Sequence, residues 1–236
     1  MNTVYIVMPA YNEEANIKDV VQAWYPLLEG KSRDSKLVIA DSGSTDATHS
    51  ILAAMQEEYP GLEILSETAK QHGPKLIALY QYAIDRGAEF IFQTDSDGQT
   101  SPDEFESFWN LRKKYDAVLG YRKVRGDGKS RAFVEQVVCF LLWMFFGVRV
   151  PDANAPFRLM NTGLVKKYLG RLPLEYNIPN IMMTTFFAYY NEKVHFKKIT
   201  FKPRQGGVNS INILKIVGIG WQALHDFRQF RKGMKG

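Results

Sequence analysis

The sequence predicts an α/β fold in which helices cover both faces of a mainly parallel sheet. Short apolar runs alternate with helical patterns through the first 120 residues, as in chains whose parallel strands are joined by helices. Polar turns follow three of these runs, and such turns meet where ligands bind, beyond the carboxyl ends of the strands. With 236 residues, 45% of them hydrophobic, the chain can form a sizeable core.

The first strand and the first helix follow directly from the pattern. An apolar run at residues 5–8 is stopped by Pro9, which predicts a buried strand. Apolar residues then recur at helical spacing as far as Leu28, so a helix is expected to begin at Asn12 or Glu13.

The next elements repeat this alternation. An apolar run at 37–40 predicts a second strand, and Asp46 in the following turn is expected to cap a helix that continues to about Glu58. The same reasoning predicts a strand at 62–65, a helix at 73–86, a strand at 89–93 and a helix that begins at Ser101 and Pro102.

Beyond Asp116 the pattern is less regular. It predicts strands at 117–119 and 194–201, and helices at 131–146, 161–169, 178–190 and 211–230. The longest apolar run, at 137–148, is too short to span a bilayer as a helix. The helix at 211–230 has a broad apolar face, which either packs on the domain or lies on a membrane.

Composition narrows the class of protein. The net charge of +5 suits an anionic ligand or a membrane surface, although a solvated basic face would give the same value. Cys139 is the only cysteine, which excludes an internal disulfide and a cysteine-rich zinc site. Residues 1–14 lack the basic and apolar regions of a signal peptide, so we expect a cytoplasmic protein.

Two carboxylates crowd the turn QTDSDGQ after the strand expected at 89–93. Asp95 and Asp97 flank one serine, and like charges this close repel each other unless a cation is bound. With Gln99 they offer the hard oxygen ligands that Mg²⁺ and Mn²⁺ prefer, whereas a simple surface turn is the alternative. A calcium loop is excluded, because Thr100 stands where that loop requires glycine.

Asp41 is a candidate for nucleotide recognition. It ends the strand at 37–40, where a carboxylate can accept hydrogen bonds from a base or a ribose; helix capping is the alternative, but Asp46 fills that role better. The sequence contains neither a Walker loop nor a GxGxxG motif, so phosphates must be bound by a metal and basic side chains. The basic candidates are Lys75, Arg122, Arg131 and Arg204.

Three motifs, in this order, resemble those of the family 2 glycosyltransferases, whose fold is termed GT-A. They are PAYNEE at 9–14, DSGSTD at 41–46 and DSDGQ at 95–99. The resemblance implies a mixed, mainly parallel, Rossmann-like sheet. It also implies one GT-A domain over 1–210, with a nucleotide-binding half at 1–120 and an acceptor half at 121–210, followed by an amphipathic helix and basic tail at 211–236.

The second half resembles the dolichol-phosphate mannose synthase branch, whose members load sugars onto polyprenyl phosphates. The matching segments are PDANAPFR at 151–158 and RQGGVNS at 204–210, besides Arg122 and Arg131. Two positions depart from that branch, since Glu135 replaces a serine and Pro156 replaces a glycine. An anionic side chain near an acceptor phosphate is unfavourable, so a glycan acceptor stays open beside a lipid phosphate.

The resemblance implies a role for each matching residue. The nucleotide site would comprise Pro9, Ala10, Tyr11, Glu13, Asp41, Gly73, Lys75, Asp95, Ser96 and Arg204. The metal ligands would be Asp95, Asp97 and Gln99. Arg122 and Arg131 would act on the phosphates during catalysis. Asp152 would be the general base for an acceptor hydroxyl, whereas a phosphate acceptor is already ionised and needs no base.

The implied activity is metal-dependent, inverting transfer of a sugar from a UDP- or GDP-type sugar donor in cell-envelope glycan synthesis. A divalent ion and arginines would stabilise the charge that builds on the diphosphate leaving group. The expected partners include the inner face of the cell membrane or a membrane protein, but no nucleic acid. The alternatives are a nucleotide-sugar binding module without turnover and a nucleotidyltransferase; PAYNEE argues against the latter, having neither glycine nor a basic residue.

Overall fold

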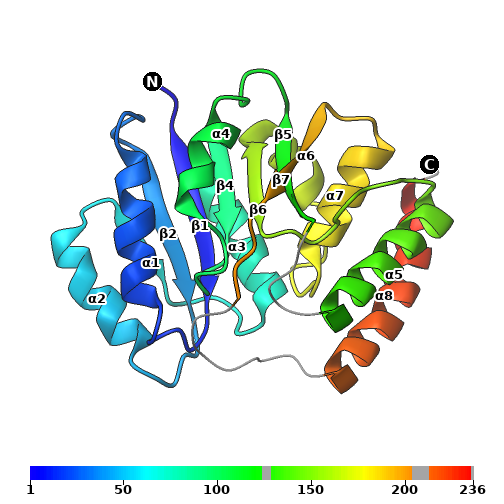
Figure 1. The fold of residues 1–236 in the computed structure, drawn as a ribbon, viewed down its shortest axis with the longest axis horizontal. Coiled ribbons are helices and arrows are strands. Elements are labelled where there is room, and N and C mark those ends of the chain that lie inside the picture. The colour runs from blue at the N-terminus through cyan, green and yellow to red at the C-terminus, as the bar shows by residue number, and fades with distance from the viewer. Residues whose placement is uncertain (124–128, 204–212, 235–236) are drawn as a thin grey trace.

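One seven-stranded sheet organises the chain (Figure 1). The computed structural model describes residues 1–123, 129–203 and 213–234, without the side chains of 129–131 and 213–222. Within these residues the strand order is β3-β2-β1-β4-β6-β5-β7. The strands are β1 (Val4–Ala10), β2 (Lys36–Asp41), β3 (Leu62–Leu65), β4 (Phe90–Thr94), β5 (Ala117–Arg122), β6 (Phe157–Asn161) and β7 (Val194–Ile199).

Helices connect these strands. The α-helices are α1 (Ile17–Trp24), α2 (Thr48–Glu58), α3 (His72–Asp85), α4 (Phe105–Trp109), α5 (Lys129–Phe146), α6 (Thr162–Leu169), α7 (Pro179–Tyr189) and α8 (Ile213–Met234). Two short 3-10 helices, η1 (Tyr25–Leu28) and η2 (Pro102–Glu104), extend α1 and precede α4. In the part of the chain that the structure describes, none of the helices combines the length and hydropathy needed to cross a membrane.

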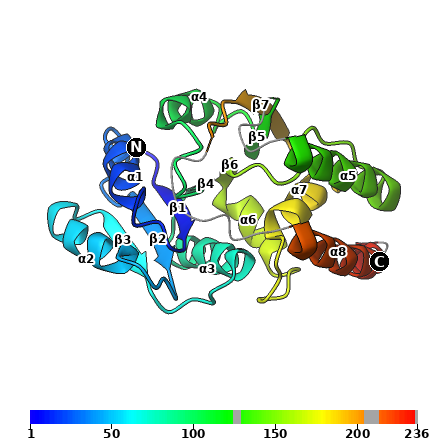
Figure 2. The same cartoon turned by 60° about the horizontal axis from the view of Figure 1, so that its bottom comes forward.

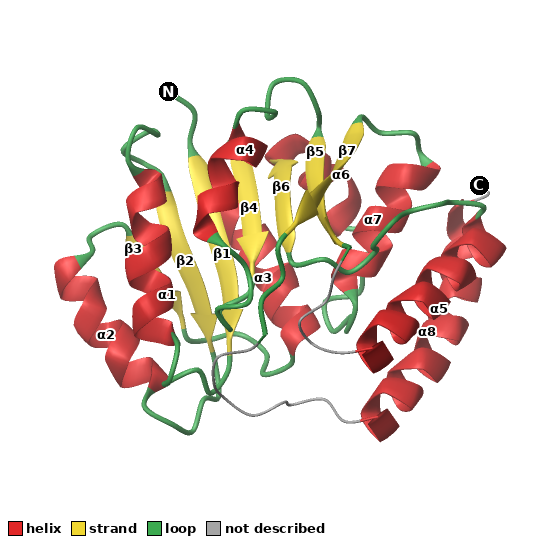
Figure 3. Cartoon of the chain, viewed as in Figure 1, coloured by secondary structure: helices red, strands yellow, loops and turns green. Residues whose placement is uncertain are grey.

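β6 runs antiparallel to its neighbours β4 and β5, whereas the other strand pairs are parallel (Figure 3). The predicted mixed, mainly parallel sheet is therefore confirmed. The sequence does not predict β6 itself, because its five residues pair with strands that are distant along the chain, and a local pattern does not report such pairing.

Two apolar layers cover the two faces of the sheet. Residues of α1, α2 and α4 form one layer, and residues of α3, α5, α6, α7 and α8 form the other. β1 serves both layers through the alternation of its side chains, with Ile6 and Met8 in the first layer and Tyr5 and Val7 in the second. Figure 2 shows α1 and α4 on one side of the strands and α3 and α6 on the other.

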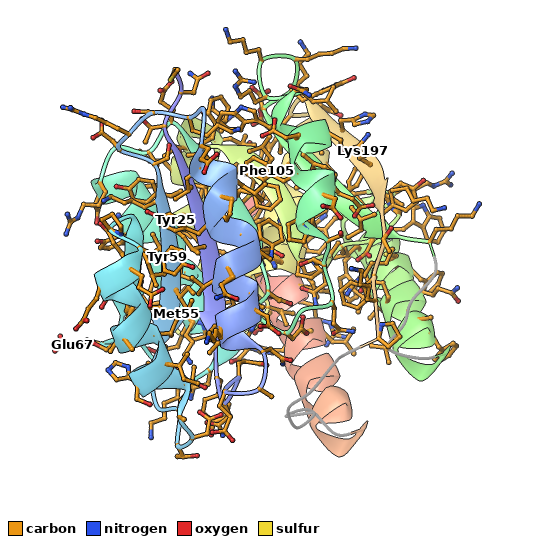
Figure 4. The ribbon with its side chains drawn as sticks, turned by 60° about the vertical axis from the view of Figure 1, so that its left-hand side comes forward. Tyr25, Met55, Tyr59, Glu67, Phe105 and Lys197 are labelled. Carbon is orange, nitrogen blue, oxygen red and sulfur yellow. The ribbon has the colours of Figure 1, made fainter. Side chains whose placement is uncertain are left out.

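Aromatic contacts fix α1 and α2 against the sheet. Trp24 at the end of α1 lies 5.7 Å from Phe92 of β4 and 6.0 Å from Phe157 of β6, measured between ring centroids. Tyr25 and Tyr59 meet edge to face at 4.8 Å, and Figure 4 shows this pair near α1 and α2. The Trp24 contacts therefore fix the C-terminal end of α1 on the sheet, and the Tyr25–Tyr59 contact joins the C-terminal ends of α1 and α2.

The first helix begins later than the sequence predicts. Asn12 adopts a φ of 55°, which is left-handed and incompatible with an α-helix, and α1 starts at Ile17. Pro26 lacks the amide hydrogen that would continue α1, and a 3-10 helix follows instead. Asp46 caps α2 from outside, since its Oδ1 accepts the amide of Thr48 at 3.0 Å.

Candidate active site

The three polar turns lie together at the carboxyl edge of the sheet. Ala10 and Asp41, the last residues of β1 and β2, are paired in the strand register. Ser96, in the turn after β4, donates a hydrogen bond from Oγ to the carbonyl oxygen of Pro9 at 2.8 Å. The acidic turn is thus bonded directly to the first turn.

Asn12 ties the first turn to the second. Its amide donates to Ser44 Oγ at 3.0 Å, and its side-chain Oδ1 accepts the amide of Thr45 at 2.8 Å. These two bonds hold Asn12 in its left-handed conformation, which costs free energy for a residue with a side chain. The strained residue therefore lies at the contact between the turns that follow β1 and β2.

Asp41 is buried, and its carboxylate is held by two side chains. Ser44 Oγ donates to Oδ1 at 2.5 Å, and His49 Nδ1 of α2 lies 3.2 Å from Oδ2. A carboxylate oriented in this way, at the end of a parallel strand, can recognise donor groups of a ligand.

Lys75 of α3 lies inside the protein beneath the first turn. Its Nζ donates to the carbonyl oxygen of Ala10 at 2.5 Å and lies 5.4 Å from the ring centroid of the exposed Tyr11. Burial lowers the pKa of Lys75 to about 8, and the nearby Asp41 carboxylate opposes that shift. Lys75 therefore supports the end of β1 as a buried cation.

Glu13 and Gly73, both expected at the nucleotide, make close contacts within the protein. The amide of Glu13 donates to Thr48 Oγ1 at 2.8 Å, and its buried carboxylate accepts the side-chain amide of Asn16 at 2.9 Å. Gly73 lies at the start of α3, where an added Cβ would come within 2.3 Å of the Tyr176 carbonyl oxygen. This close approach requires glycine.

The acidic turn after β4 is braced on both sides. Gln93 Nε2 donates to Asp95 Oδ1 at 3.3 Å, and Asp97 Oδ1 accepts the amide of Gln99 at 3.1 Å. Gln99 is buried and makes two hydrogen bonds with Lys202, each 2.8 Å long. Gln99 Nε2 donates to the main-chain carbonyl oxygen of Lys202, and the Lys202 amide donates to the main-chain carbonyl oxygen of Gln99.

The donor set of this turn fits a hard divalent cation. Asp95 and Asp97 are partly buried carboxylates separated by one residue, and Ser96 between them is held to Pro9. No group of three or more histidine, cysteine or acidic side chains arranged for a metal occurs among the described residues. A metal here would complete its coordination with ligand oxygens or water.

Arg122 and Asp152, expected to act separately on phosphate and acceptor, are partners of each other. Nε and Nη2 of Arg122 donate to the two oxygens of Asp152 at 2.8 and 2.9 Å, and the Arg122 amide adds a third bond at 3.1 Å. The Arg122 guanidinium also lies 5.0 Å from the ring centroid of Phe201. In this arrangement the Asp152 carboxylate is fully engaged by a cation.

Glu135, the acidic departure from the branch pattern, is accommodated within the protein. Its Oε1 accepts the amide of Ala153 at 2.8 Å, and its Oε2 lies 3.6 Å from Nη2 of Arg122. Arg122 therefore faces both Glu135 and Asp152, and its single positive charge offsets only part of the charge of the two carboxylates.

A buried polar cluster, which the sequence motifs do not predict, lies behind these groups. Its members are Tyr80, Gln93, Arg158, Asn180 and Thr184, and all of them are buried. Polar residues inside the apolar run IPNIMMTTFF are the signal that could have identified Asn180 and Thr184. Two expected site residues cannot be placed, because Arg204 and the side chain of Arg131 lie outside the described residues.

The fold is Rossmann-like, and the clustered turns form a candidate ligand site at the carboxyl edge of the sheet. The model of Glycosyl transferase family 2 matches residues 5–169, and the chain belongs to this family. The resemblance of the motifs to that family is thereby confirmed.

Several similar proteins are named as sugar transferases of undecaprenyl or dolichyl phosphate. An undecaprenyl-phosphate 4-deoxy-4-formamido-L-arabinose transferase of Shewanella sediminis is 26% identical over 89% of this chain. An undecaprenyl-phosphate mannosyltransferase of Micrococcus luteus is 26% identical over 66% of this chain. The chain spans 64% and 65% of the lengths of these two relatives. A UDP-N-acetylglucosamine–dolichyl-phosphate N-acetylglucosaminyltransferase of Methanococcus voltae is 28% identical, over 69% of this chain and 71% of its own length.

Solved structures share the fold. Glucosyl-3-phosphoglycerate synthase from Mycobacterium tuberculosis in complex with UDP superposes with a TM-score of 0.69 at 18% identity, covering 98% of this chain and 80% of that one. The same enzyme with Mn²⁺, UDP-glucose and phosphoglyceric acid gives a TM-score of 0.70 at 18% identity, with coverage of 98% and 80%. The expected GT-A fold is confirmed.

Proposed function

We propose that the chain is a metal-dependent, inverting glycosyltransferase that moves a sugar from a nucleoside diphosphate sugar to a polyprenyl phosphate. One observation carries the proposal. In a chain of Glycosyl transferase family 2, the turns bearing Asp41, Asp95 and Asp97 are bonded together at the carboxyl edge of the sheet. Relatives described as acting on undecaprenyl and dolichyl phosphates support the acceptor class.

The nucleoside binds at the first two turns in this proposal. Pro9, Ala10 and the exposed ring of Tyr11 form one wall, and the oriented carboxylate of Asp41 accepts hydrogen bonds from the base or ribose. Lys75 supports this wall from below through the Ala10 carbonyl group. UDP is favoured over GDP, since one of the similar solved structures is a complex with UDP and the name of one relative includes UDP-N-acetylglucosamine.

Asp95, Asp97 and Gln99 would hold Mn²⁺ or Mg²⁺ in this proposal. When bound, the metal supplies positive charge to the diphosphate as it leaves. Asp97 is fixed by the amide of Gln99, and Asp95 is fixed by Gln93, so little reorganisation is needed on binding. Arg131 and Arg204 are proposed to contact phosphates.

The acceptor approaches on the side of Arg122 and Asp152. An ionised phosphate needs no general base, so Asp152 serves there to orient Arg122 toward an anion. A hydroxyl acceptor would instead need Asp152 as the base, and the carboxylate would have to exchange its bonds to Arg122 first. The bidentate pair therefore favours the phosphate acceptor over a glycan. Inversion follows if the acceptor oxygen displaces the diphosphate in one step.

A membrane-facing role for α5 agrees with a lipid acceptor. Five large apolar side chains of this helix are exposed, namely Phe133, Val137, Phe140, Trp143 and Met144. Four of them recur at intervals of three or four residues, which places them on one face of the helix. Apolar faces of this kind insert into the boundary of a bilayer, so we propose peripheral membrane contact through α5.

Calorimetry with UDP, GDP and CDP, each with and without Mn²⁺, tests the site. We expect one nucleotide to bind in a Mn²⁺-dependent way, and we expect Asp97→Asn to abolish that dependence. Asp103→Asn is the matched control, because Asp103 lies near the same turn but bonds only to Ser101 in the described contacts. Unchanged Mn²⁺ dependence in Asp97→Asn would refute the metal site.

A further inference from the structure

A chain of buried hydrogen bonds leads from α3 through α7 to the acidic turn. Tyr80 Oη donates to Asn180 Oδ1 at 2.8 Å. Asn180 Nδ2 donates to Gln93 Oε1 at 3.1 Å, and Gln93 Nε2 donates to Asp95 Oδ1 at 3.3 Å. The first three residues are buried, with at most 3% of their surface exposed.

The negative charge of Asp95 fixes the donor and the acceptor in each of these hydrogen bonds. An ionised carboxylate only accepts hydrogen bonds, so Gln93 must turn its amide nitrogen toward Asp95. Gln93 then presents Oε1 to Asn180, which must answer with Nδ2 and present its own Oδ1 to Tyr80. Burial raises the pKa of the Tyr80 hydroxyl well above its usual value, which keeps the proton that the last link needs.

We propose that Tyr80, Asn180 and Gln93 form a positioning relay that holds Asp95 in the orientation required for the metal-bound nucleotide. The inference rests on the proposed function, which assigns Asp95 to the ribose or the metal. Asn180 is the residue that sequence reasoning would least expect in this role. It lies on α7, in the half of the chain expected to bind the acceptor, yet it acts on a carboxylate of the donor site.

Asn180 also holds a cation behind the acceptor side. Nη1 of Arg158 donates to the Asn180 carbonyl oxygen at 3.1 Å, and Nη2 donates to Thr184 Oγ1 at 2.9 Å. Arg158 on β6 is paired in register with Gln93 on β4. Thr184 in turn donates to the carbonyl oxygen of Ala153, the neighbour of Asp152. The first two turns of α7 therefore contact the groups behind both Asp95 and Asp152.

A network that only stabilises the fold would behave differently from a positioning relay. Cutting a structural network lowers the free energy of unfolding and leaves the ligand affinity of the folded protein unchanged. Cutting a relay weakens metal binding, and the loss is largest at the link that touches Asp95 and smallest at the far end. The affinity for Mn²⁺ of the folded, UDP-saturated protein distinguishes these cases.

Calorimetric titration of Mn²⁺ into the UDP-saturated 236-residue chain, well below each melting temperature, is the test. Gln93→Met removes the donor to Asp95, a hydrogen bond to a charged group, so we expect about tenfold weaker Mn²⁺ binding. We expect a smaller loss for Asn180→Leu and the smallest loss for Tyr80→Phe. Thr185→Val is the matched control, because Thr185 is buried on α7 and bonds only to the Ile181 carbonyl oxygen at 2.8 Å in the described contacts.

The graded loss, with wild-type affinity in Thr185→Val, supports the relay. Affinities within about twofold of wild type in Gln93→Met and Asn180→Leu would overturn it. Should Asn180→Leu fail to fold, Asn180→Ser makes a smaller change at the same position and is judged by the same threshold. Absence of Mn²⁺-dependent UDP binding in the wild-type protein would instead contradict the proposed function, and the relay with it.

Discussion

Arg122 and Asp152 form a buried, bidentate ion pair that joins the end of β5 to the segment before β6. Their side chains are only 5% and 2% exposed, and the two bonds measure 2.8 and 2.9 Å. The pair lies where the acceptor is proposed to bind, so its charges serve both the stability of this region and the chemistry proposed for it.

Removing either side chain of the Arg122–Asp152 pair should lower the free energy of unfolding. Asp152→Ala leaves the Arg122 guanidinium buried without its main partner, and we expect the free energy of unfolding to fall by about 3–5 kcal/mol in urea denaturation. A double-mutant cycle with Arg122→Ala should give a coupling energy above about 1.5 kcal/mol.

The exposed pair Lys167–Glu192 provides the control for that cycle. Its lysine side chain is 58% exposed, so the coupling energy should stay below about 1 kcal/mol. Equal coupling energies for the two pairs would contradict the role assigned to burial at Arg122 and Asp152.

Substitutions of Asn12 should change both the stability of the protein and its affinity for UDP. Both Asn12→Gly and Asn12→Ala lose the bond to Thr45, but only alanine retains the steric cost of positive φ, so the alanine variant should be less stable by about 1 kcal/mol. UDP affinity, measured by calorimetry, should fall in both variants because the first two turns lose one of the bonds that hold them together.

Asn191, with a φ of 54° at the end of α7, is the matched control for Asn12. Substituting it with glycine and alanine should reproduce the stability difference while leaving UDP affinity unchanged. A loss of UDP affinity in the Asn191 variants would show that the effect at Asn12 is not specific to the site.

Stability should rise with pH through the titration of Lys75. Its folded-state pKa is lowered to about 8 by burial, against about 10.4 in an unfolded chain. Between these values the unfolded state keeps a proton that the folded state has lost, so the free energy of unfolding increases by at most about 1.4 kcal/mol per pH unit. Below this window both states are protonated, and the contribution is constant.

Comparison with Lys75→Met isolates this effect from other titrating groups. Urea denaturation should show that the unfolding free energy of the wild type increases relative to that of Lys75→Met as the pH rises above about 8. A difference that is independent of pH up to about 10 would mean that Lys75 titrates normally.

The exposed face of α5 should mediate vesicle binding. Phe140→Glu together with Met144→Glu places charge on that face, so binding to vesicles with anionic phospholipids should fall severalfold in a flotation assay. Leu174→Glu is the control, because Leu174 is 76% exposed but lies outside α5. Equal losses in the two variants would argue against a specific membrane face.

The polar turns were predictable because each follows a short apolar run, and parallel strands bring such turns to one edge. The contacts between residues that are distant along the chain were not predictable. Arg122 and Asp152 are thirty residues apart, and Tyr80 and Asn180 are a hundred apart, as their hydrogen bonds record. Local patterns report burial and turns, whereas these pairs join elements that are distant along the chain and leave no local signal. The antiparallel pairing of β6 likewise leaves none.

The most direct test is sugar transfer from radiolabelled donors to a polyprenyl phosphate in the presence of Mn²⁺. We expect a labelled lipid product with a UDP-sugar, no product when the metal is chelated, and a rate lower by about a hundredfold or more in Asp97→Asn. If the protein binds UDP with Mn²⁺ but forms no product with any UDP- or GDP-sugar, the chain is a nucleotide-sugar binding module and the proposed transferase activity is wrong.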